Sequence, residues 1–476
     1  METKENQLNL FERFNRWMQE SITVKLISIG FLVLILLIPS SWIQDLMQER
    51  QGRAESVMSE ISAKWSDNQT LSGPILVIPY KVRKKIDHGK EGVEIQEYIE
   101  KFFLLPETLD IKGEVNPTVL HRGIFDAAVY ASSLDINANF GKPDFQSFKV
   151  ADELVLWKDA YMIFSITDLR GISENPLFNV GGLAKSSEPS STVGVSVRKF
   201  LKDIPSAYPR GVEVPNESNT DFSSNGIIAK LGWQSESDFK GNTSIKINLK
   251  GSTRLFFNPT GKTTTLQLAG PWSSPSFDGE FLPESREISD TNFSARWKIL
   301  HYNRPFAQAW TDADVRLSGS EFGVKLIIPV DQYQKSIRTS KYGHLIIILT
   351  FVALFLVEIT KKIRIHPFQY ILIAAALIIY YTLLLSLSEQ VGYNVAYAIA
   401  SIATVTLICF YSFTFLTSRM LVALFTGLLL IFYSFIFIIV LQQDFSLLIG
   451  SIGLFLIVAA LMYFARKVNW YGEATS

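Results

Sequence analysis

The chain has 476 residues, of which 45 are Lys or Arg and 45 are Asp or Glu, so its formal net charge is zero. This balance excludes a strongly basic nucleic-acid-binding protein, and we expect no nucleic acid among its partners. The single cysteine, Cys409, lies in an apolar stretch and can form no intrachain disulfide, so the fold needs no covalent cross-link.

The first 43 residues predict an amphipathic segment followed by a membrane span. Residues 8–20 place apolar and charged side chains on opposite faces of a helix, which is typical of a helix lying on a membrane; a flexible tail is the alternative. Residues 22–43 are apolar, with Lys25 able to reach the interface and Pro39 near the end. A cleaved signal peptide is the competing interpretation, but no A-x-A-like site follows, so we favour a retained anchor.

Residues 44–340 predict a β-rich domain with a leading stalk helix. From Ser41 to Trp65 apolar residues recur at a period near 3.6, which indicates the stalk. Short runs rich in β-branched and aromatic residues then predict strands. These runs are 74–80, 97–105, 109–115, 124–131, 160–166, 245–249, 263–268, 294–300 and 323–329. Residues 183–192 and 213–225 are rich in Ser, Asn and Pro and are predicted to be loops.

Residues 341–476 contain five apolar runs, each long enough to cross a bilayer as a helix. They cover 342–359, 368–385, 393–415, 420–441 and 445–465. The predicted fold is therefore a mixed membrane protein. It combines a large antiparallel, sandwich-like β domain with a helical bundle of six spans, one N-terminal and five C-terminal.

Basic residues flank alternate ends of the spans, which predicts the orientation of the chain. The opposite loops carry Glu389 and Asp444 and no cation. We therefore expect both termini in the cytoplasm, the β domain in the periplasm and the spans in the inner membrane of a two-membrane bacterium. The basic residues are Lys4, Arg13, Arg16, Lys25, Lys361, Lys362, Arg364, Arg419, Arg466 and Lys467.

Searches for chemistry give little. The five histidines are scattered without metal-ligand spacing, and two S-x-x-K matches lack the S-D-N and K-T-G motifs that accompany them in serine acyl-enzymes. We expect no catalytic residue, cofactor or metal, and the chain is predicted not to be an enzyme. The remaining candidates are polar residues of the membrane block, because ionisable groups within a bilayer usually serve a function.

Five residues of that block are candidate functional residues. Glu358 is expected to form a local ion pair with Lys361 or Lys362. His366 precedes Pro367 and is interpreted as a cap for the third span. Ser386, Ser388 and Glu389 are predicted to form the turn between the third and fourth spans, as a solvated loop or as a coupling site. Four tyrosines near that end are interpreted as an aromatic belt: Tyr380, Tyr381, Tyr393 and Tyr397.

Several short motifs along the chain resemble one known family. They include Ile38-Pro39 with Glu49-Arg50, Ser72-Gly73-Pro74, Arg122-Gly123-Ile124, Asp168-Leu169-Arg170-Gly171-Ile172, Pro329-Val330-Asp331 with Tyr333, Lys341-Tyr342-Gly343, Ile365-His366-Pro367 with Gln369-Tyr370, and Leu383-Leu384-Leu385-Ser386-Leu387-Ser388-Glu389. With these motifs the chain resembles the CreD family of bacterial inner-membrane proteins. The resemblance implies a non-enzymatic, Gram-negative protein that is linked to cell-envelope integrity and controlled by an envelope-stress regulator.

Two functions follow as expectations. The first is a non-catalytic envelope-maintenance protein whose β domain binds a periplasmic protein, lipid or wall component. The second is a small transporter or sensor in which the β domain captures a ligand and the bundle transmits or conducts. A transporter of known type would show internal repeats with helices broken by Gly or Pro, and the five C-terminal spans show none, which favours the first. The sequence leaves the oligomeric state open.

The orientation can be tested with reporter fusions. A reporter active only in the cytoplasm should work when fused after Arg419 and fail when fused after Ser320, because the basic clusters sort to one side of the membrane. Cytoplasmic activity at Ser320 would contradict both the orientation and the periplasmic location of the β domain.

Overall fold

The computed structural model of the chain describes residues 22–87, 93–191, 195–198, 222–223, 225–311, 315–328, 332–361, 363–416, 418–442 and 445–466. The amphipathic segment predicted at 8–20 lies outside these residues. The chain forms two compact units, a helical unit of Met1–Glu55 with Val330–Ser476 and a β unit of Ser56–Pro329. Residues 44–55 and 330–340 therefore belong with the helices, whereas the sequence analysis assigned them to the β domain.

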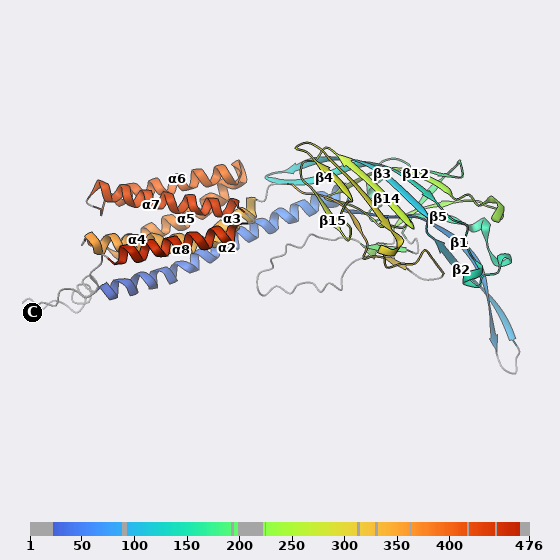
Figure 1. The fold of residues 1–476 in the computed structure, drawn as a ribbon, viewed down its shortest axis with the longest axis horizontal. Coiled ribbons are helices and arrows are strands. Elements are labelled where there is room, and N and C mark those ends of the chain that lie inside the picture. The colour runs from blue at the N-terminus through green and yellow to red at the C-terminus, as the bar shows by residue number, and fades with distance from the viewer. Residues whose placement is uncertain are drawn as a thin grey trace, which may run out of the picture. The chain divides into compact units, whose positions relative to one another are not determined.

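Six helices among the described residues are long and apolar enough to cross a membrane, as predicted. The first is α2 (Ile22–Trp65), and the last five spans lie between residues 332 and 465 (Figure 1). The C-terminal helices are α3 (Gln332–Lys341), α4 (Gly343–Lys361), α5 (Pro367–Val391), α6 (Tyr393–Ser412), α7 (Arg419–Leu441) and α8 (Ser446–Ala465). Helices α3 and α4 together make the second span.

The first span and the predicted stalk are one continuous helix, α2, which runs through Pro39. Proline has no amide hydrogen and so removes one backbone hydrogen bond from the helix. The Ser41 hydroxyl donates to the carbonyl of Ile38 at 2.7 Å in the same turn. The helix therefore does not restart at Ser41, and residues up to Glu55 of α2 belong to the helical unit while Ser56–Trp65 belong to the β unit.

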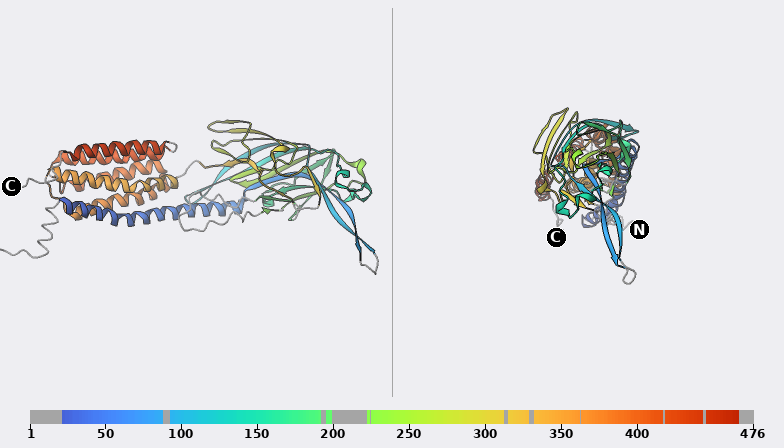
Figure 2. Two further views of the ribbon diagram at one scale, coloured as in Figure 1. Left: turned by 60° about the horizontal axis from the view of Figure 1, so that its bottom comes forward. Right: turned by 90° about the vertical axis from the view of Figure 1, so that its right-hand side faces the viewer.

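The interior of the helical unit joins α2 to the C-terminal helices. Leu36, Ile43 and Met47 of α2 share one buried apolar cluster with side chains of α4, α5, α6 and α7, for example Phe351 and Tyr380. The left view of Figure 2 shows the helices of the bundle side by side. In α8, by contrast, only 6% of the most apolar stretch is buried, so most of this helix is left to contact the lipid of the bilayer.

The β unit contains two large sheets. The nine-stranded sheet has the order β15 (Pro275–Gly279), β20 (Phe322–Leu326), β13 (Arg254–Phe257), β1 (Gln69–Asp87), β5 (Tyr161–Ile166), β11 (Gly226–Lys230) and β8 (Ser187–Ser190), with β2 (Val93–Leu104) paired to β1 and β18 (Ala309–Thr311) to β2. The eight-stranded sheet has the order β16 (Ser285–Ile288), β17 (Phe293–Leu300), β14 (Thr263–Gly270), β3 (Thr108–Arg122), β4 (Phe125–Asn139), β12 (Asn242–Ser252), β6 (Leu177–Val180) and β7 (Leu183–Lys185). A small third sheet consists of β10 (Phe222–Ser223), β9 (Val195–Arg198) and β19 (Val315–Leu317).

All nine predicted segments coincide with strands, although Pro329, at the end of the last one, lies outside the described residues. The loop predicted at 183–192 is wrong, because it contains β7 and β8. Both are short strands at the edges of the sheets, where one side is unpaired and no alternation of apolar residues is required. The loop predicted at 213–225 falls mostly outside the described part of the chain, and its Phe222–Ser223 forms β10.

Most strand pairs are antiparallel, as predicted, but each large sheet contains one parallel pair. In the nine-stranded sheet β1 lies parallel to β13, with Gln69 opposite Leu255. In the eight-stranded sheet β3 lies parallel to β14, with Thr108 opposite Thr263. Each of these pairs joins an early strand of the chain to a late one.

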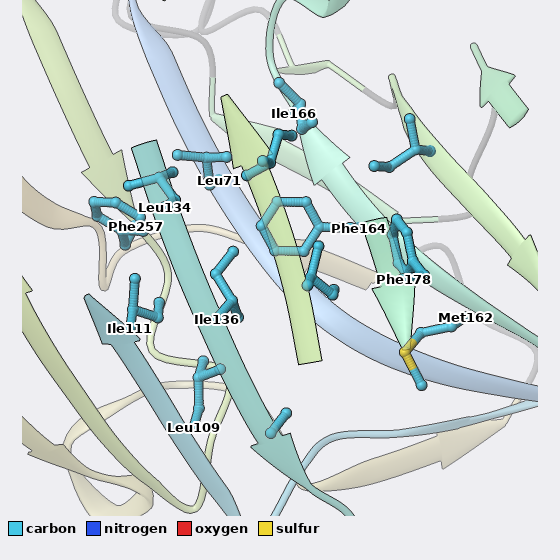
Figure 3. Packing of buried hydrophobic residues seen from close by; sticks show 14 of the residues in the cluster. Leu71, Leu109, Ile111, Leu134, Ile136, Met162, Phe164, Ile166, Phe178 and Phe257 are labelled. Carbon is cyan, nitrogen blue, oxygen red and sulfur yellow. The ribbon is translucent and has the colours of Figure 1, made fainter. Parts of the chain in front are cut away.

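The two large sheets pack face to face as a sandwich, which confirms the predicted β architecture. One buried cluster contains side chains from both sheets, including Leu71 and Phe164 from the nine-stranded sheet and Ile111, Ile136 and Phe178 from the eight-stranded sheet (Figure 3). Strands of the eight-stranded sheet alternate between core and solvent, as in β17, where every second residue is buried.

The nine-stranded sheet is covered on both faces near its centre. Ile75, Leu76, Val77 and Ile78 are four successive residues of β1, and all are fully buried. Leu76 and Ile78 face the sandwich core, whereas Ile75 and Val77 join a second cluster with Trp310 and other side chains on the opposite face. This double burial explains why the segment has a continuous apolar run instead of an alternating pattern.

Candidate functional site

A buried ion pair connects α2 to the rest of the helical unit. The Lys25 ammonium of α2 donates to Oε1 of Glu358 of α4 at 2.6 Å. The hydroxyl of Tyr370 on α5 donates to Oε2 of Glu358 at 3.0 Å, and the amide of Ile365 donates to its Oε1 at 3.3 Å. We call these residues the Glu358 node.

Burial makes the pairing in the Glu358 node necessary. The Glu358 side chain is only 3% exposed, while that of Lys25 retains 20% exposure. A carboxylate removed from water is stable only when donors surround it, and here three donors from different segments do so. The sequence analysis expected Glu358 to pair with Lys361 or Lys362. Lys362 lies outside the described residues, and among the described residues the basic partner of Glu358 is Lys25, from the other end of the chain.

His366 caps α5. Its backbone amide donates to Oε1 of Gln369 at 2.9 Å, and its Nδ1 accepts from the amide of Phe368 at 3.2 Å, a reciprocal capping box. Pro367 follows at the first helical position, where its missing amide hydrogen costs nothing. The predicted capping role is confirmed, and the imidazole is exposed.

A second polar contact involves α2 and Glu389. The Tyr333 hydroxyl of α3 donates to Oε1 of Glu389 at 3.0 Å, and Nε of Arg50 on α2 lies 3.9 Å from the same oxygen. The Glu389 side chain is only 10% exposed. We call these three residues the Glu389 node.

The turn predicted at Ser386, Ser388 and Glu389 is wrong, because α5 continues through all three to Val391. The chain turns at Gly392, which adopts φ = +79°, a conformation that glycine tolerates. Ser386 is exposed and Ser388 is buried, its hydroxyl donating to the Leu385 carbonyl of its own helix at 2.8 Å. Only Glu389 of the three reaches other helices, so it is not a solvated loop residue.

The four tyrosines interpreted as an aromatic belt lie inside the bundle, so that interpretation was wrong. Their exposed fractions are at most 4%, and Tyr433 of α7 joins them at 2%. The Tyr397 hydroxyl donates to the carbonyl of Tyr433 at 2.7 Å. The distance of a residue from the end of a span does not indicate the face of the helix on which its side chain lies. The four are Tyr380, Tyr381, Tyr393 and Tyr397.

Within the β unit, Asp168 fixes the C-terminal end of α2 to the sheets. Arg170 donates to both carboxylate oxygens of Asp168, at 2.9 Å from Nε and 2.7 Å from Nη2. The amide of Asp67, just beyond the helix, donates to Asp168 at 3.0 Å. Nη1 of Arg170 donates to the carbonyl of Ala63 at 2.8 Å, in the last turn of α2, where a cation complements the helix dipole. We call these residues the Asp168 joint.

Burial acts to raise the pKa of Asp168, but the hydrogen bonds from Arg170 and from the amides of Asp67 and Arg170 outweigh it and lower the pKa to about 2. The charged form is therefore the one that the fold stabilises. The same contact raises the pKa of Arg170.

Gln69 and Gly171 complete the packing around the joint. The Gln69 amide nitrogen donates to the carbonyls of Asp168 and Lys250 at 2.9 Å and 3.1 Å, and its oxygen accepts from the Asp168 amide at 3.2 Å. A Cβ atom at Gly171 would clash with the Lys250 carbonyl. Glycine at this position therefore permits the close approach of the Asp168 loop to β12.

A polar groove of about 500 Å³ lies on the solvent face of the eight-stranded sheet. Small residues such as Gly113, Ala269 and Ser294 form part of its lining. Charged side chains of both signs surround it, namely Lys112, Arg286 and Arg296 with Glu114, Asp135 and Glu287. Sequence reasoning did not find this groove, because its residues come from strands far apart in the chain.

Among the described residues, no group of three or more His, Cys, Asp or Glu side chains is arranged to hold a metal ion. Within each node and within the joint, the polar groups contact one another. The Glu358 node and the Glu389 node each include a residue of α2, and the joint includes Ala63 of α2 and Asp67 just beyond it. These contacts join α2 to α4, to α5 and to the Asp168 loop of the β unit.

The comparisons with known proteins identify the family. Residues 21–471 match the family model of the inner membrane protein CreD. The chain belongs to the CreD family. It is 30% identical over 451 residues to the inner membrane protein CreD of Escherichia coli strain K12, covering 94% of this chain and 93% of that protein. Together with the six apolar helices found among the described residues, this membership makes the chain a multi-pass protein of the inner membrane.

Several motifs through which the chain resembles the CreD family supply these contacts. Arg50 and Tyr333 belong to the Glu389 node, Tyr370 to the Glu358 node, and Asp168 with Arg170 to the joint. A further motif residue, Arg122, at the end of β3, forms an ion pair with Glu60 of α2 at 2.5 Å. These motif residues therefore take part in the contacts that surround α2.

We expect Glu358→Gln to lower the stability of the purified protein, because Lys25 then keeps its charge without a counter-ion. Removing one partner of a buried pair costs about 3–5 kcal/mol, and the partial exposure of Lys25 places the expected loss near the lower end. Thermal unfolding in detergent measures the effect.

The double variant Lys25→Met/Glu358→Gln provides the control for this prediction. It should recover part of the stability, since neither charge is then buried alone. Losses that simply add in the double variant would show that the two side chains are not coupled.

The Asp168 joint predicts a pH dependence. Because the pKa of Asp168 is lower in the folded chain than its ordinary value of 3.8, its contribution to stability is complete above that pH and disappears as the pH falls towards 2. Asp168→Asn should lower the free energy of unfolding at pH 7, measured by urea denaturation, by about 2 kcal/mol as for a charged hydrogen bond. The difference in this free energy from wild type should shrink between pH 4 and pH 2.

The matched control is Asp135→Asn, which changes an exposed carboxylate on β4. It should leave the free energy of unfolding at pH 7 within about 0.5 kcal/mol of wild type. A difference between wild type and Asp168→Asn that stays constant down to pH 2 would contradict the role assigned to the ionised carboxylate.

Proposed function

We propose that this CreD-family protein supports cell-envelope integrity without catalysis, and that its β unit is a periplasmic binding module whose state is communicated to the membrane helices. The termini lie in the cytoplasm in this proposal, as the basic residues beside the spans predict. Envelope stress is the condition under which the protein acts.

One observation carries the proposal. The helix α2 is continuous from Ile22 to Trp65 and has polar contacts at both ends as well as along its length. Lys25 and Arg50 bind the carboxylates of Glu358 and Glu389 in the helical unit, and Arg170 binds the last turn of α2 in the β unit. A simple anchor would need only apolar packing against lipid, so charged contacts at three positions support transmission along α2.

The polar groove supports a binding role for the β unit. It measures about 500 Å³, within the size range of ligand sites, and its lining carries three basic and three acidic side chains. Such a surface complements ligands that carry both charges and amide groups. Peptide segments of envelope proteins and of the cell wall have this chemistry, and we propose them as partners.

The positions of the carboxylates favour this function over a transporter. Helices α4 to α8 contain two carboxylates, Glu358 and Glu389, and both are bound to side chains of neighbouring helices. A proton or cation path uses carboxylates that exchange their partners with the transported ion. Here each carboxylate instead joins α2 to the bundle.

Glu389→Gln tests the proposal, because it keeps the size of the side chain and removes its charge. In a strain lacking the native gene, this variant should be present at wild-type level and yet reduce survival in detergent or under another envelope stress. Tyr333→Phe, which removes the hydroxyl that donates to Glu389, should change survival in the same direction and by a smaller amount.

Glu153→Gln is the matched control, since it removes an exposed carboxylate of the β unit. It should protect the envelope as well as the wild type does. Wild-type survival of the Glu389→Gln strain at equal protein abundance would remove the Glu389 node from the mechanism and leave the bundle as an anchor.

A further inference from the structure

A largely apolar groove lies beside the Glu358 node. Its volume is about 280 Å³, and α2 and α5 supply most of its lining. Phe31 and Ile35 of α2 and Ile371 of α5 form part of the apolar wall, while Lys25, Glu358 and Tyr370 supply the polar groups. The groove thus combines an apolar surface with a charged group.

The apolar wall opens towards lipid. Phe31 is 64% exposed, Ile35 is 45% exposed and Ile371 is 42% exposed, and all three lie in helices that cross the membrane. Exposed apolar side chains of membrane-spanning helices contact hydrocarbon. The groove is therefore accessible from the bilayer, where lipid acyl chains are the abundant apolar molecules.

The polar side of the groove has an excess of positive charge. The Lys25 side chain lines the groove and keeps 20% exposure although it is bound to Glu358. Arg364, which is exposed, immediately precedes the lining residue Ile365, and the exposed Lys361 ends α4. The lining itself carries one cation and one carboxylate, and among the described residues the excess of positive charge comes from Lys361 and Arg364, which lie close to lining residues in the chain. This excess favours an anionic group over a zwitterionic one.

We propose that the groove is a binding site for one anionic phospholipid of the bilayer, whose acyl chain lies along Phe31 and Ile371 and whose phosphate contacts Lys25. This inference is independent of the proposed function. Because lipid tails are as apolar as the groove, moving an acyl chain from the bilayer into it gains little hydrophobic energy. Selectivity must therefore come from the headgroup, through charge-assisted hydrogen bonds from Lys25.

The test uses the full-length protein and native mass spectrometry. Wild-type protein is reconstituted with phosphatidylglycerol and phosphatidylethanolamine that carry identical acyl chains, and in a separate sample with oleate, and the lipids retained after detergent exchange are counted. We expect one phosphatidylglycerol per protein, retained at least fivefold more than phosphatidylethanolamine or oleate.

Two tryptophan variants locate the site. Ile371→Trp fills the groove while leaving the Lys25–Glu358 pair unchanged, and it should reduce phosphatidylglycerol retention at least fivefold. Ile402→Trp adds the same bulk at a lipid-exposed position of α6, 63% exposed and outside the groove lining, and should retain lipid like the wild type. Melting temperatures in detergent alone establish that both variants are folded.

Three results would overturn the proposal. Equal retention of phosphatidylglycerol and phosphatidylethanolamine would remove the headgroup preference. Equal retention of oleate, whose carboxylate is also an anion, would show that the groove takes any anionic amphiphile and does not recognise the phospholipid. Retention that is unchanged in folded Ile371→Trp, or lost equally in Ile402→Trp, would show that the lipid binds elsewhere on the bundle.

Discussion

A carboxylate inside a membrane bundle must be surrounded by donors, and in this chain that requirement determines where the first helix lies. Glu358 is almost completely buried, and its own helix supplies no basic partner. Lys25 supplies the ammonium, Tyr370 a hydroxyl and Ile365 an amide, so α2, α5 and the segment before α5 must all meet at this carboxylate. Apolar packing alone would allow α2 to rotate or slide against the bundle, because lipid and helix surfaces are equally apolar. The ion pair removes that freedom.

Two further polar contacts hold α2 in place. Glu389 pairs with Arg50 of α2 in the helical unit, and the Asp168 joint holds the last turn of α2 in the β unit. One helix therefore carries fixed contacts in two units that otherwise have separate cores.

Much of the fold could be predicted from the sequence, whereas most of the site could not. The six spans and nine of the strands depend on local apolar patterns, which a single sequence displays directly. The hydrogen-bond and ion-pair partners of a polar side chain depend on which elements, distant in sequence, pack against it. Sequence proximity therefore predicts a pair between Glu358 and Lys361, whereas the structure pairs Glu358 with Lys25. The opposite charges of Lys25 and Glu358, near the same end of two spans, are the sequence signal for this pair. Glu389 was placed in a turn because polar residues are common both in turns and at helix ends. Tyr380 was assigned to the lipid interface because the sequence shows its depth but not its neighbours.

The parallel pairs in the two large sheets affect how the β unit is made. Strand β1 can complete its hydrogen bonds only after β13 has been synthesised, and β3 only after β14. Until then the edges formed by Gln69–Leu71 of β1 and Thr108–Glu114 of β3 are open to pairing with any other chain, and such edges promote aggregation. Closing these pairs late also brings together segments far apart in sequence, which slows folding. A chain that stops before β13 would therefore expose two unpaired strand edges, so truncated products should be insoluble or rapidly degraded rather than partly functional.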